Sequence, residues 1–174
     1  MMQPASIIHI RQAVLDDLPE ILTLFVGTIQ HTCQNDYNAE QIAAWTASVD
    51  NKSRWQDALA DQYFLVAEID NKLVGFSSLE HGNYLDFMYV HYAYERRGIA
   101  HTLYQAIETE ARRLGSTFIT AYVSKTARSF FEKQGFKVVK ENKNLIRSIE
   151  LINYKMIKNI ENLPLTLYQQ TEKT

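Results

Sequence analysis

Glu95-Arg96-Arg97-Gly98-Ile99-Ala100 connects a β-type run to the most regular amphipathic helix pattern in the chain. At such a junction the first helical amides have no partner within the helix, and the helix dipole places partial positive charge there. Gly98 has no β-carbon, so a ligand can approach the backbone closely, and Arg96 and Arg97 add positive charge. Together these features predict a binding site for a pyrophosphate group.

A simpler interpretation of the same loop is that Gly98 only permits a turn and that the two arginines are solvated. Two well-known phosphate loops are excluded, because the chain has no G-x-x-x-x-G-K-[ST] and no G-x-G-x-x-G after its first strand. The surrounding segments therefore decide between the two interpretations.

The chain before the loop predicts one strand, three helices and a meander of three strands. A first strand is expected at 7–11. Asp17, followed by Pro19 and Glu20, is a typical helix start, and apolar residues recur at helical spacing to about Thr32. Further helices are expected over 39–49 and around Trp55. Strand-like runs follow at 63–69, 72–80 and 84–91, the first two joined by a good hairpin turn at Asp70-Asn71.

The chain after the loop begins with the strong helix, expected over 98–114 and ended by Gly115. A strand at 117–123 follows this helix and is therefore expected to run parallel to the strand at 84–91. A short helix at 126–134, a strand opening at 136–139 and a last strand at 149–157 complete the pattern, and 143–148 has no clear assignment.

Composition limits the class of protein. The 174 residues, 46% hydrophobic and 22% charged, predict one domain with a core at about 7–157 and a polar tail at 159–174. A formal charge of −2 without a basic cluster argues against a nucleic-acid partner. Cys33 is the one cysteine, so an internal disulfide is excluded. No run is apolar enough for a membrane span or a signal peptide, and a cytoplasmic protein is expected.

In this context the sequence resembles the GNAT superfamily of acetyl-CoA-dependent N-acetyltransferases. Their signature [QR]-x-x-G-x-[GA] corresponds to residues 95–100. A second family segment, usually Asn-x-x-Ala-x-x-Phe-Tyr-Glu-Lys-x-Gly-Phe, corresponds to Ser124-Lys125-Thr126-Ala127-Arg128-Ser129-Phe130-Phe131-Glu132-Lys133-Gln134-Gly135-Phe136. Both motifs occur in the family's order and in the expected strand or helix context, and the resemblance covers roughly 7–157.

The resemblance implies an α/β fold with a mixed sheet of six or seven strands, flanked by four to five helices. The strands at 84–91 and 117–123 would diverge at one end, with pantetheine in the gap and an amide of Tyr89 or Val90 stabilising the oxyanion. The residues expected to contact acetyl-CoA are Met88, Tyr89, Val90, Arg96, Arg97, Gly98, Ile99, Ala100, Ser124, Phe131 and Lys133.

Three residues depart from the family pattern. Glu95 stands where Gln or Arg is usual, which removes a positive contact. Ser124 replaces Asn, and it either contacts pantetheine or only caps the following helix. Phe131 replaces a Tyr that in many relatives protonates the departing thiolate.

A general base is expected because a lysine-like acceptor with a pKa of about 10.4 loses its proton at neutral pH at a cost of about 4.6 kcal/mol. Asp86 and Glu80 are the favoured candidates, with His81 and His91 behind them. Strand alternation places Asp86 on the face of Met88 and Val90, whereas a bulge would exchange the faces, and Asp86 can also be a purely structural carboxylate. Tyr122 either replaces the missing acid or packs with its hydroxyl in water.

The function expected from these observations is acetyl transfer from acetyl-CoA to a small-molecule or peptide amine, by direct attack in a ternary complex. A non-catalytic acyl-CoA-binding regulatory module and a generic nucleotide-binding domain are the alternatives. Tyr37, Trp45 and Trp55 either line an acceptor pocket for an apolar or aromatic amine or belong to the core. No metal site is expected, and a homodimer is a reasonable default.

Overall fold

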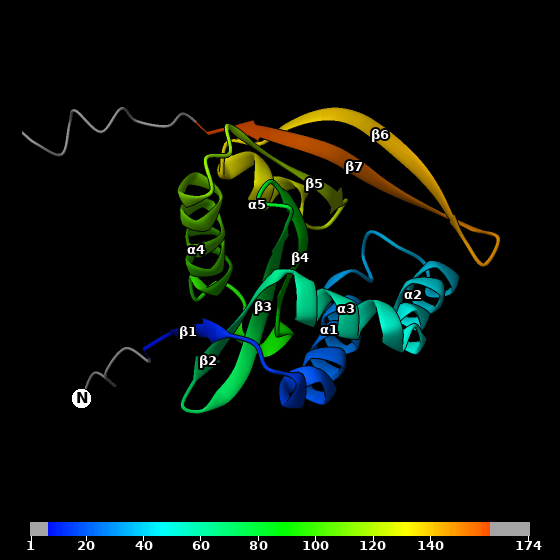
Figure 1. The fold of residues 1–174 in the computed structure, drawn as a ribbon. Helices are drawn as coiled ribbons and strands as arrows, with labels where there is room; N and C mark the ends of the chain where they lie inside the picture. The colour runs from blue at the N-terminus through cyan, green and yellow to red at the C-terminus, as the bar shows by residue number, and fades with distance from the viewer. Residues whose placement is uncertain (1–6, 161–174) are drawn as a thin grey trace, which may run out of the picture.

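A mixed sheet of seven strands organises residues 7–160, which are the residues that the computed structural model describes (Figure 1). The strand order is β1-β2-β3-β4-β5-β7-β6. The strands are β1 His9–Gln12, β2 Tyr63–Ile69, β3 Lys72–Glu80, β4 Tyr84–Val90, β5 Phe118–Ser124, β6 Lys137–Ile146 and β7 Ile149–Asn159. The helices are α1 Leu18–Thr32, α2 Ala39–Thr46, α3 Lys52–Asp61, α4 Ile99–Arg113 and α5 Arg128–Lys133. The predicted α/β class and mixed sheet are confirmed.

The five α-helices divide between the two faces of the sheet (Figure 1). One core cluster joins α4 and α5 to the sheet through Leu103, Ile107 and Phe131. The other joins α1 and α3 to the opposite face through Phe25, Trp55 and Phe76. Trp55 is 1% exposed, so of its two sequence interpretations the structure places it in the core.

The β4–β5 pair is the parallel pair that the sequence predicts, and it separates early. Within the described residues its register consists of Tyr84↔Thr120 and Leu85↔Ala121. By contrast, β5 pairs with β7 along its whole length, from Phe118 to Ser124. The ends of β4 and β5 near Val90 and Ser124 therefore diverge, as expected.

A bulge in β4 changes the direction of Asp86. Ser78 pairs with Phe87 and Leu79 pairs with Leu85, which leaves Asp86 between two register positions. Because one extra residue shifts the alternation, Asp86 and Phe87 share the face covered by α3. Plain alternation would have placed Asp86 on the face of Met88, so the bulged alternative is the one found.

Several local predictions need correction. Asp17 precedes α1 without a side-chain bond to an α1 amide in the described structure. Its carboxylate instead accepts two bonds of 2.8 Å from Arg11 and one from the amide of Val14, because the ion pair to β1 competes with capping. The helix expected over 39–49 ends at Thr46 and continues as a 3-10 turn over Ala47–Asp50. Asn38 caps α2 by accepting from the amide of Gln41.

At the chain's C-terminal end, the unassigned segment 143–148 comprises the end of β6, 143–146, and the turn of the β6–β7 hairpin at Arg147 and Ser148, which both have positive φ. The last strand extends beyond the predicted 157 to Asn159, and Ile160 is buried and donates its amide to Thr117. The rest of the predicted polar tail, 161–174, lies outside the described residues.

Candidate functional site

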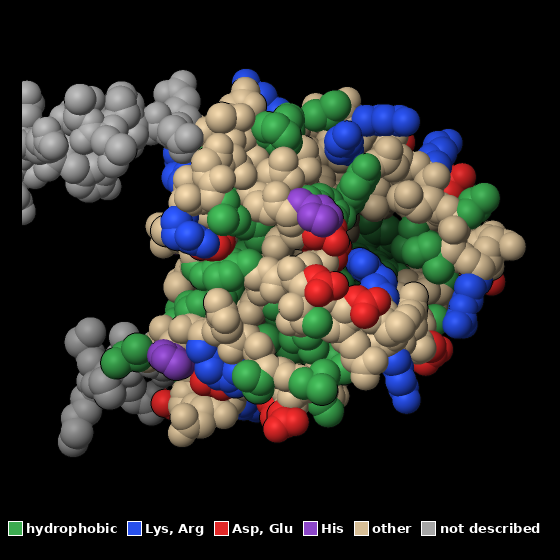
Figure 2. All heavy atoms as spheres, in the orientation of Figure 1, with side chains coloured by type: hydrophobic (Ala, Val, Ile, Leu, Met, Phe, Trp, Pro, Cys, Tyr) green, Lys and Arg blue, Asp and Glu red, His purple; other side chains and the backbone are tan. Residues whose placement is uncertain are grey.

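The gap between β4 and β5 opens into a cavity of about 590 Å³. The surface is hollowed there, between the β6–β7 hairpin and helices α2 and α3 (Figure 2). The cavity has two parts, each bordered by one of the two core clusters. We call them the α4 side, lined by Met88, Val90, Ala100, Val123, Ser124, Phe130 and Phe131, and the α2 side, lined by Cys33, Tyr37, Trp45, Asp86, Tyr89 and Leu151.

Backbone groups of β4 face this gap. His91 donates its amide to the carbonyl of Val74 on β3 at 2.8 Å. Because backbone groups alternate in direction along an antiparallel pair, Tyr89 also points its amide toward β3, whereas Met88 and Val90 point theirs toward β5. The carbonyl of Val90 accepts a bond of 2.8 Å from the Thr28 hydroxyl of α1. Of the two amides considered from the sequence as oxyanion donors, that of Val90 faces the gap.

The loop before α4 has the geometry of an open helix start. Gly98 is the N-cap residue with φ +82°, and no described heavy atom lies within 4 Å of the position that a β-carbon would take. Arg96, two residues before Gly98, also has a positive φ of 59°. The first amides of α4 have no acceptor inside the helix, and Ala100 lines the cavity. The start of α4 therefore offers donors to an anion that extends out of the gap.

Five of the residues expected to contact the cofactor lie away from the cavity wall. Arg96, Arg97 and Gly98 are exposed in the loop beside it, Ile99 is buried beneath the loop, and Lys133 is exposed at the end of α5. The guanidinium of Arg97 lies 4.9 Å from the centre of the Tyr94 ring. The remaining six residues line the cavity, and they are Met88, Tyr89, Val90, Ala100, Ser124 and Phe131.

The three departures from the family pattern have distinct surroundings. Glu95 lines the cavity beside α1, where its carboxylate accepts a bond from the Thr32 hydroxyl. Ser124 accepts a bond of 3.1 Å from the amide of Ala127 in the turn before α5, but the N-cap residue of α5 is Ala127, so Ser124 does not cap that helix as one sequence alternative expected. Phe131 is 3% exposed and packs edge-on against Phe136. A hydroxyl is therefore missing at a position that is both buried and on the cavity wall.

Asp86 lies on the α2 side as part of an ion pair. Its side chain is 5% exposed, and its two oxygens accept bonds of 3.1 Å from Arg54 and 2.8 Å from Gln62. A carboxylate buried to this degree needs such partners to keep its charge. Asp86 thus combines a structural role with a position on the cavity wall.

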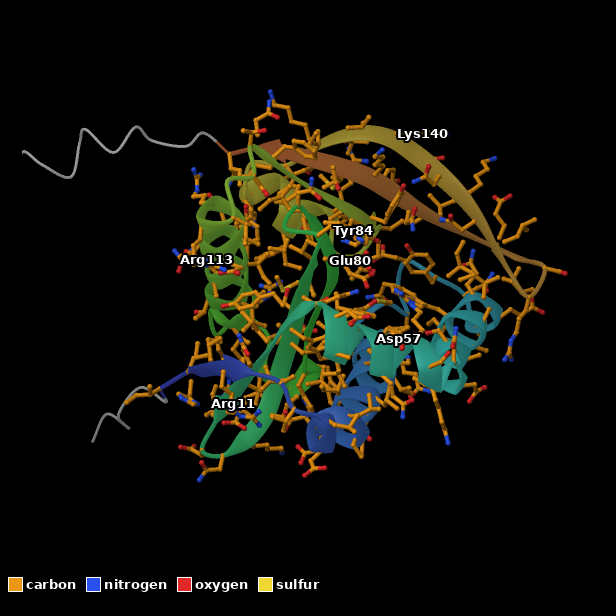
Figure 3. All side chains as sticks on the ribbon, in the orientation of Figure 1. Arg11, Asp57, Glu80, Tyr84, Arg113 and Lys140 are labelled. Carbon is orange, nitrogen blue, oxygen red and sulfur yellow. The ribbon has the colours of Figure 1, made fainter. Side chains whose placement is uncertain are left out.

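The other acid-base candidates divide between the cavity and the outside. Glu80 pairs with Tyr84 at the end of the β3–β4 hairpin, where both are labelled in Figure 3, and it borders a separate shallow pocket with Arg54. His81 lies in the exposed hairpin turn, and His91 stacks on Tyr92. Burial lowers the pKa of His91, with a smaller effect from Lys72. Tyr122 lines the cavity, is 52% exposed and meets the Tyr84 ring edge-on.

Tyr37 connects three segments around the α2 side. Its hydroxyl donates to the carbonyl of Ile152 on β7 at 2.7 Å and accepts from the amide of Lys125 at 2.9 Å. Burial raises the pKa of Tyr37 to about 12. Its ring meets Trp45 edge-on. Of the three aromatic residues singled out in the sequence, Tyr37 and Trp45 line the cavity, and both also pack with the second core cluster.

Sequence reasoning did not find several residues of the cavity wall. Thr28 and Thr32 come from the last turns of α1, and Asn144 and Asn153 come from the β6–β7 hairpin. The threonines occur at a helical spacing of four, which places them on one face of α1. The asparagines carry no local signal, because their position depends on the pairing of two long strands.

Comparisons with known proteins agree with this architecture. Residues 33–158 match the family model described as an acetyltransferase (GNAT) domain. The chain is 34% identical over 151 residues to the uncharacterized N-acetyltransferase YafP of Escherichia coli (strain K12), covering 86% of this chain and 94% of that protein.

Two solved structures have the same arrangement. A GCN5-related N-acetyltransferase from Rhodopseudomonas palustris is 29% identical with a TM-score of 0.85, covering 92% of this chain and 99% of that one. The PaiA N-acetyltransferase of Thermoplasma acidophilum, solved with coenzyme A, is 24% identical with a TM-score of 0.73, covering 88% and 99%. No helix within residues 7–160 has the length and apolarity needed to cross a bilayer.

Proposed function

The chain belongs to the GNAT acetyltransferase family, and from that premise we propose that it transfers the acetyl group of acetyl-CoA directly to an amine in a ternary complex. The observation that carries this proposal is the early separation of β4 from β5, which leaves backbone groups of β4 facing a cavity that reaches the start of α4. The PaiA relative of the same fold holds coenzyme A, which supports the choice of donor.

The described residues fit such a donor. Met88 and Val90 present amides and a carbonyl that an extended pantetheine arm can pair with, as an added strand would. The open helix start at Gly98 and Ala100 suits a diphosphate, because the amides carry partial positive charge and no β-carbon blocks the approach. In this arrangement the pantetheine arm extends along β4 from the loop at Gly98, and the thioester lies beside a β4 amide that faces the gap.

The reaction follows from these contacts. The amine nitrogen attacks the thioester carbonyl and forms a C–N bond, and an amide of β4 stabilises the oxyanion. The C–S bond then breaks, and the proton lost by nitrogen ends on the departing sulfur. A thiol with a pKa near 8.5 is an adequate leaving group as its thiolate, without protonation by an acid. The reaction can therefore proceed although Phe131 has no hydroxyl. Tyr122 is the phenol best placed to assist.

Direct attack is favoured over an acyl-enzyme. Cys33 is the thiol on the cavity wall, and burial raises its pKa. A thiol that keeps its proton is a poor nucleophile. No histidine lines the cavity among the described residues, so nothing there resembles the base of a Cys-His pair.

A non-catalytic acyl-CoA-binding module is the second candidate. It is favoured by Phe131 in place of a phenol and by the engagement of both Asp86 oxygens with Arg54 and Gln62. In this case the cavity would bind the acyl-CoA and release no product.

One experiment separates the candidates. Calorimetry measures binding of acetyl-CoA and of ATP to the full chain, and a thiol reagent measures CoA release with a panel of amines. Acetyl-CoA binding with amine-dependent thiol release supports the transferase. Binding without release for any amine supports the module, and a preference for ATP over CoA would overturn the placement of the donor.

A further inference from the structure

The α2 side of the cavity carries no cationic group that could bind an acidic acceptor. Among the described residues that line the whole cavity there is no lysine, arginine or histidine. Two cations lie behind this wall: the guanidinium of Arg54 is engaged with Asp86 at 3.1 Å, and the ammonium of Lys125 lies 5.5 Å from the centre of the Tyr37 ring. An acceptor with a carboxylate or phosphate would therefore bury its charge without a partner.

A polycationic acceptor also fits poorly. Two carboxylates line the cavity, Asp86 and Glu95. The charge of Asp86 is balanced by Arg54. Glu95 follows the end of β4 next to the proposed diphosphate site, so it lies at the opposite end of the strand from Asp86. Of the α2-side residues, Asp86 is therefore the one carboxylate, and its charge is balanced by Arg54, whereas Glu95 and Asp36 act on Cys33 from outside that set.

The titratable groups of the α2 side are also poorly suited to remove a proton from an ammonium. Burial raises the pKa values of Cys33, Tyr37 and Tyr89, so these groups keep their own protons at neutral pH. Asp86 already accepts hydrogen bonds on both oxygens, from Arg54 and Gln62. Tyr122 lines the cavity from β5, outside the α2 side, and its hydroxyl is a donor when neutral.

What the α2 side does offer is aromatic surface. The rings of Tyr37, Trp45 and Tyr89 line it, and Tyr37 and Trp45 meet edge-on with centroids 5.4 Å apart. Leu151 and Ile146 from the β6–β7 hairpin close the wall. Rings in such an arrangement favour a flat aromatic guest, and the polar groups of Asn144 and Asn153 at the margin can accommodate a substituent.

Resting on the acetyl transfer proposed above, we infer that the acceptor is a primary aromatic amine whose nitrogen carries no proton at neutral pH. Such an amine needs no general base before it attacks, whereas only about 1 in 2,500 molecules of a lysine-like amine is unprotonated at pH 7. The reacting nitrogen forms a C–N bond to the acetyl carbon as the C–S bond breaks, and its proton passes to the sulfur of coenzyme A.

Two isomers test this inference, because 4-ethylaniline and 2-phenylethylamine have the same formula and differ in where nitrogen is attached. Thiol release from acetyl-CoA is measured with each between pH 6 and pH 9. We expect kcat/KM at pH 7 to be at least about tenfold higher for 4-ethylaniline, and to be nearly independent of pH. For 2-phenylethylamine, kcat/KM should rise about tenfold per pH unit, because the fraction of neutral amine rises by that factor.

The outcomes distinguish this inference from the proposed function. A higher kcat/KM for 2-phenylethylamine at pH 7 overturns the aromatic acceptor and leaves the transferase in place. Acetyl-CoA binding without thiol release for either isomer also overturns it and favours the binding module. Absence of acetyl-CoA binding overturns the proposed function itself.

Trp45 provides a test by substitution. Trp45→Ala should raise the KM for 4-ethylaniline about tenfold while the KM for acetyl-CoA stays unchanged, because the lost ring contacts the acceptor and not the donor. Trp45→Phe should recover most of the loss. Equal changes in both KM values, or no change in either, would contradict the placement of the acceptor against Trp45.

Discussion

The α4 side and the α2 side of the cavity differ in which atoms they present. On the α4 side, Met88 and Val90 offer backbone groups, and the start of α4 offers amides that open onto free space at Gly98. On the α2 side, the wall consists of the side chains of Tyr37, Trp45 and Asp86. A site made of backbone depends on conformation and tolerates many side chains, whereas a site made of side chains changes with every substitution. Donor recognition should therefore be general, and acceptor recognition particular to this chain.

Gly98→Val should produce the largest change on the α4 side alone. We expect the Kd for coenzyme A to rise about 100-fold, which corresponds to about 2.7 kcal/mol, because the new side chain fills the open approach to the helix amides. Titration calorimetry of the full chain measures the change.

Gly115 supplies a matched control at the other end of α4. It has φ +81°, and no described heavy atom lies within 4 Å of its β-carbon position, as at Gly98. Gly115→Val should therefore carry a similar strain of about 1–3 kcal/mol in the free energy of unfolding, with coenzyme A affinity intact. Equal losses of affinity in both variants would show that strain, not blocking of the approach, causes the effect.

Glu108 tests the hydrogen-bond network that links α4 to β7. Its carboxylate accepts a bond of 2.6 Å from Lys158 on β7, and it also bonds Tyr104 and Arg112. Burial opposes its charge, but the hydrogen bonds from Lys158, Tyr104 and Arg112 outweigh burial and lower the pKa of Glu108 to about 2. Because the folded pKa is lowered, this stabilisation is fully present above the ordinary value of 4.5 and is lost as the pH falls toward 2.

Glu108→Gln should accordingly reduce the free energy of unfolding by about 2 kcal/mol at pH 7. Urea unfolding of both proteins across the pH range should show the two curves converging below pH 4. A difference that stays constant from pH 7 to pH 3 would argue against an ionised Glu108 as the source.

Arg54→Met affects the α2 side alone. Removing the partner of a carboxylate that is 5% exposed should cost about 1–2 kcal/mol of unfolding free energy, reduced by the partial exposure of Arg54. The Kd for coenzyme A should stay within about twofold, since Arg54 is absent from the α4 side. The double variant Arg54→Met, Asp86→Leu should regain stability, because it leaves no unpaired charge. A loss of coenzyme A affinity in Arg54→Met would contradict the claim that donor binding on the α4 side is independent of the α2 side.

The smallest change in the free energy of unfolding is expected for two serines of β3, the strand that pairs with β4. The hydroxyl of Ser77 donates to the carbonyl of Phe87 at 2.7 Å, whereas the buried hydroxyl of Ser78 has no partner in the described part of the chain. Thermal unfolding should show Ser77→Ala destabilised by about 1 kcal/mol and Ser78→Ala neutral or slightly stabilised. The reverse order would contradict this hydrogen-bond assignment.

The contrast between the two sides also explains what the sequence could predict. The strand ranges 63–69 and 72–80 agree with β2 and β3, because alternation, turn residues and helix caps are local. The anion-binding loop at Gly98 can be predicted for the same reason, because its residues are adjacent in the sequence. The residues of the α2 side come from the segment between α1 and α2, from α2, from β4 and from the β6–β7 hairpin, and their meeting depends on packing.

Asp86 shows the limit most directly. The direction of the Asp86 side chain depends on a bulge that the residue types of β4 do not predict. Its partners Arg54 and Gln62 lie 32 and 24 residues away in sequence. Asp17 is a similar case, because a favourable capping residue was drawn instead into an ion pair with Arg11. In both, a tertiary contact overrode the local pattern.

Cys33 gives the molecule a built-in reporter. It is the one sulfhydryl in 174 residues, it is 5% exposed, and it borders the chamber where both substrates are proposed to meet. Labelling by a maleimide should therefore be slow in the empty protein and slower still once the chamber is filled, so that alkylation followed by intact-mass spectrometry reads occupancy in native material without an engineered tag.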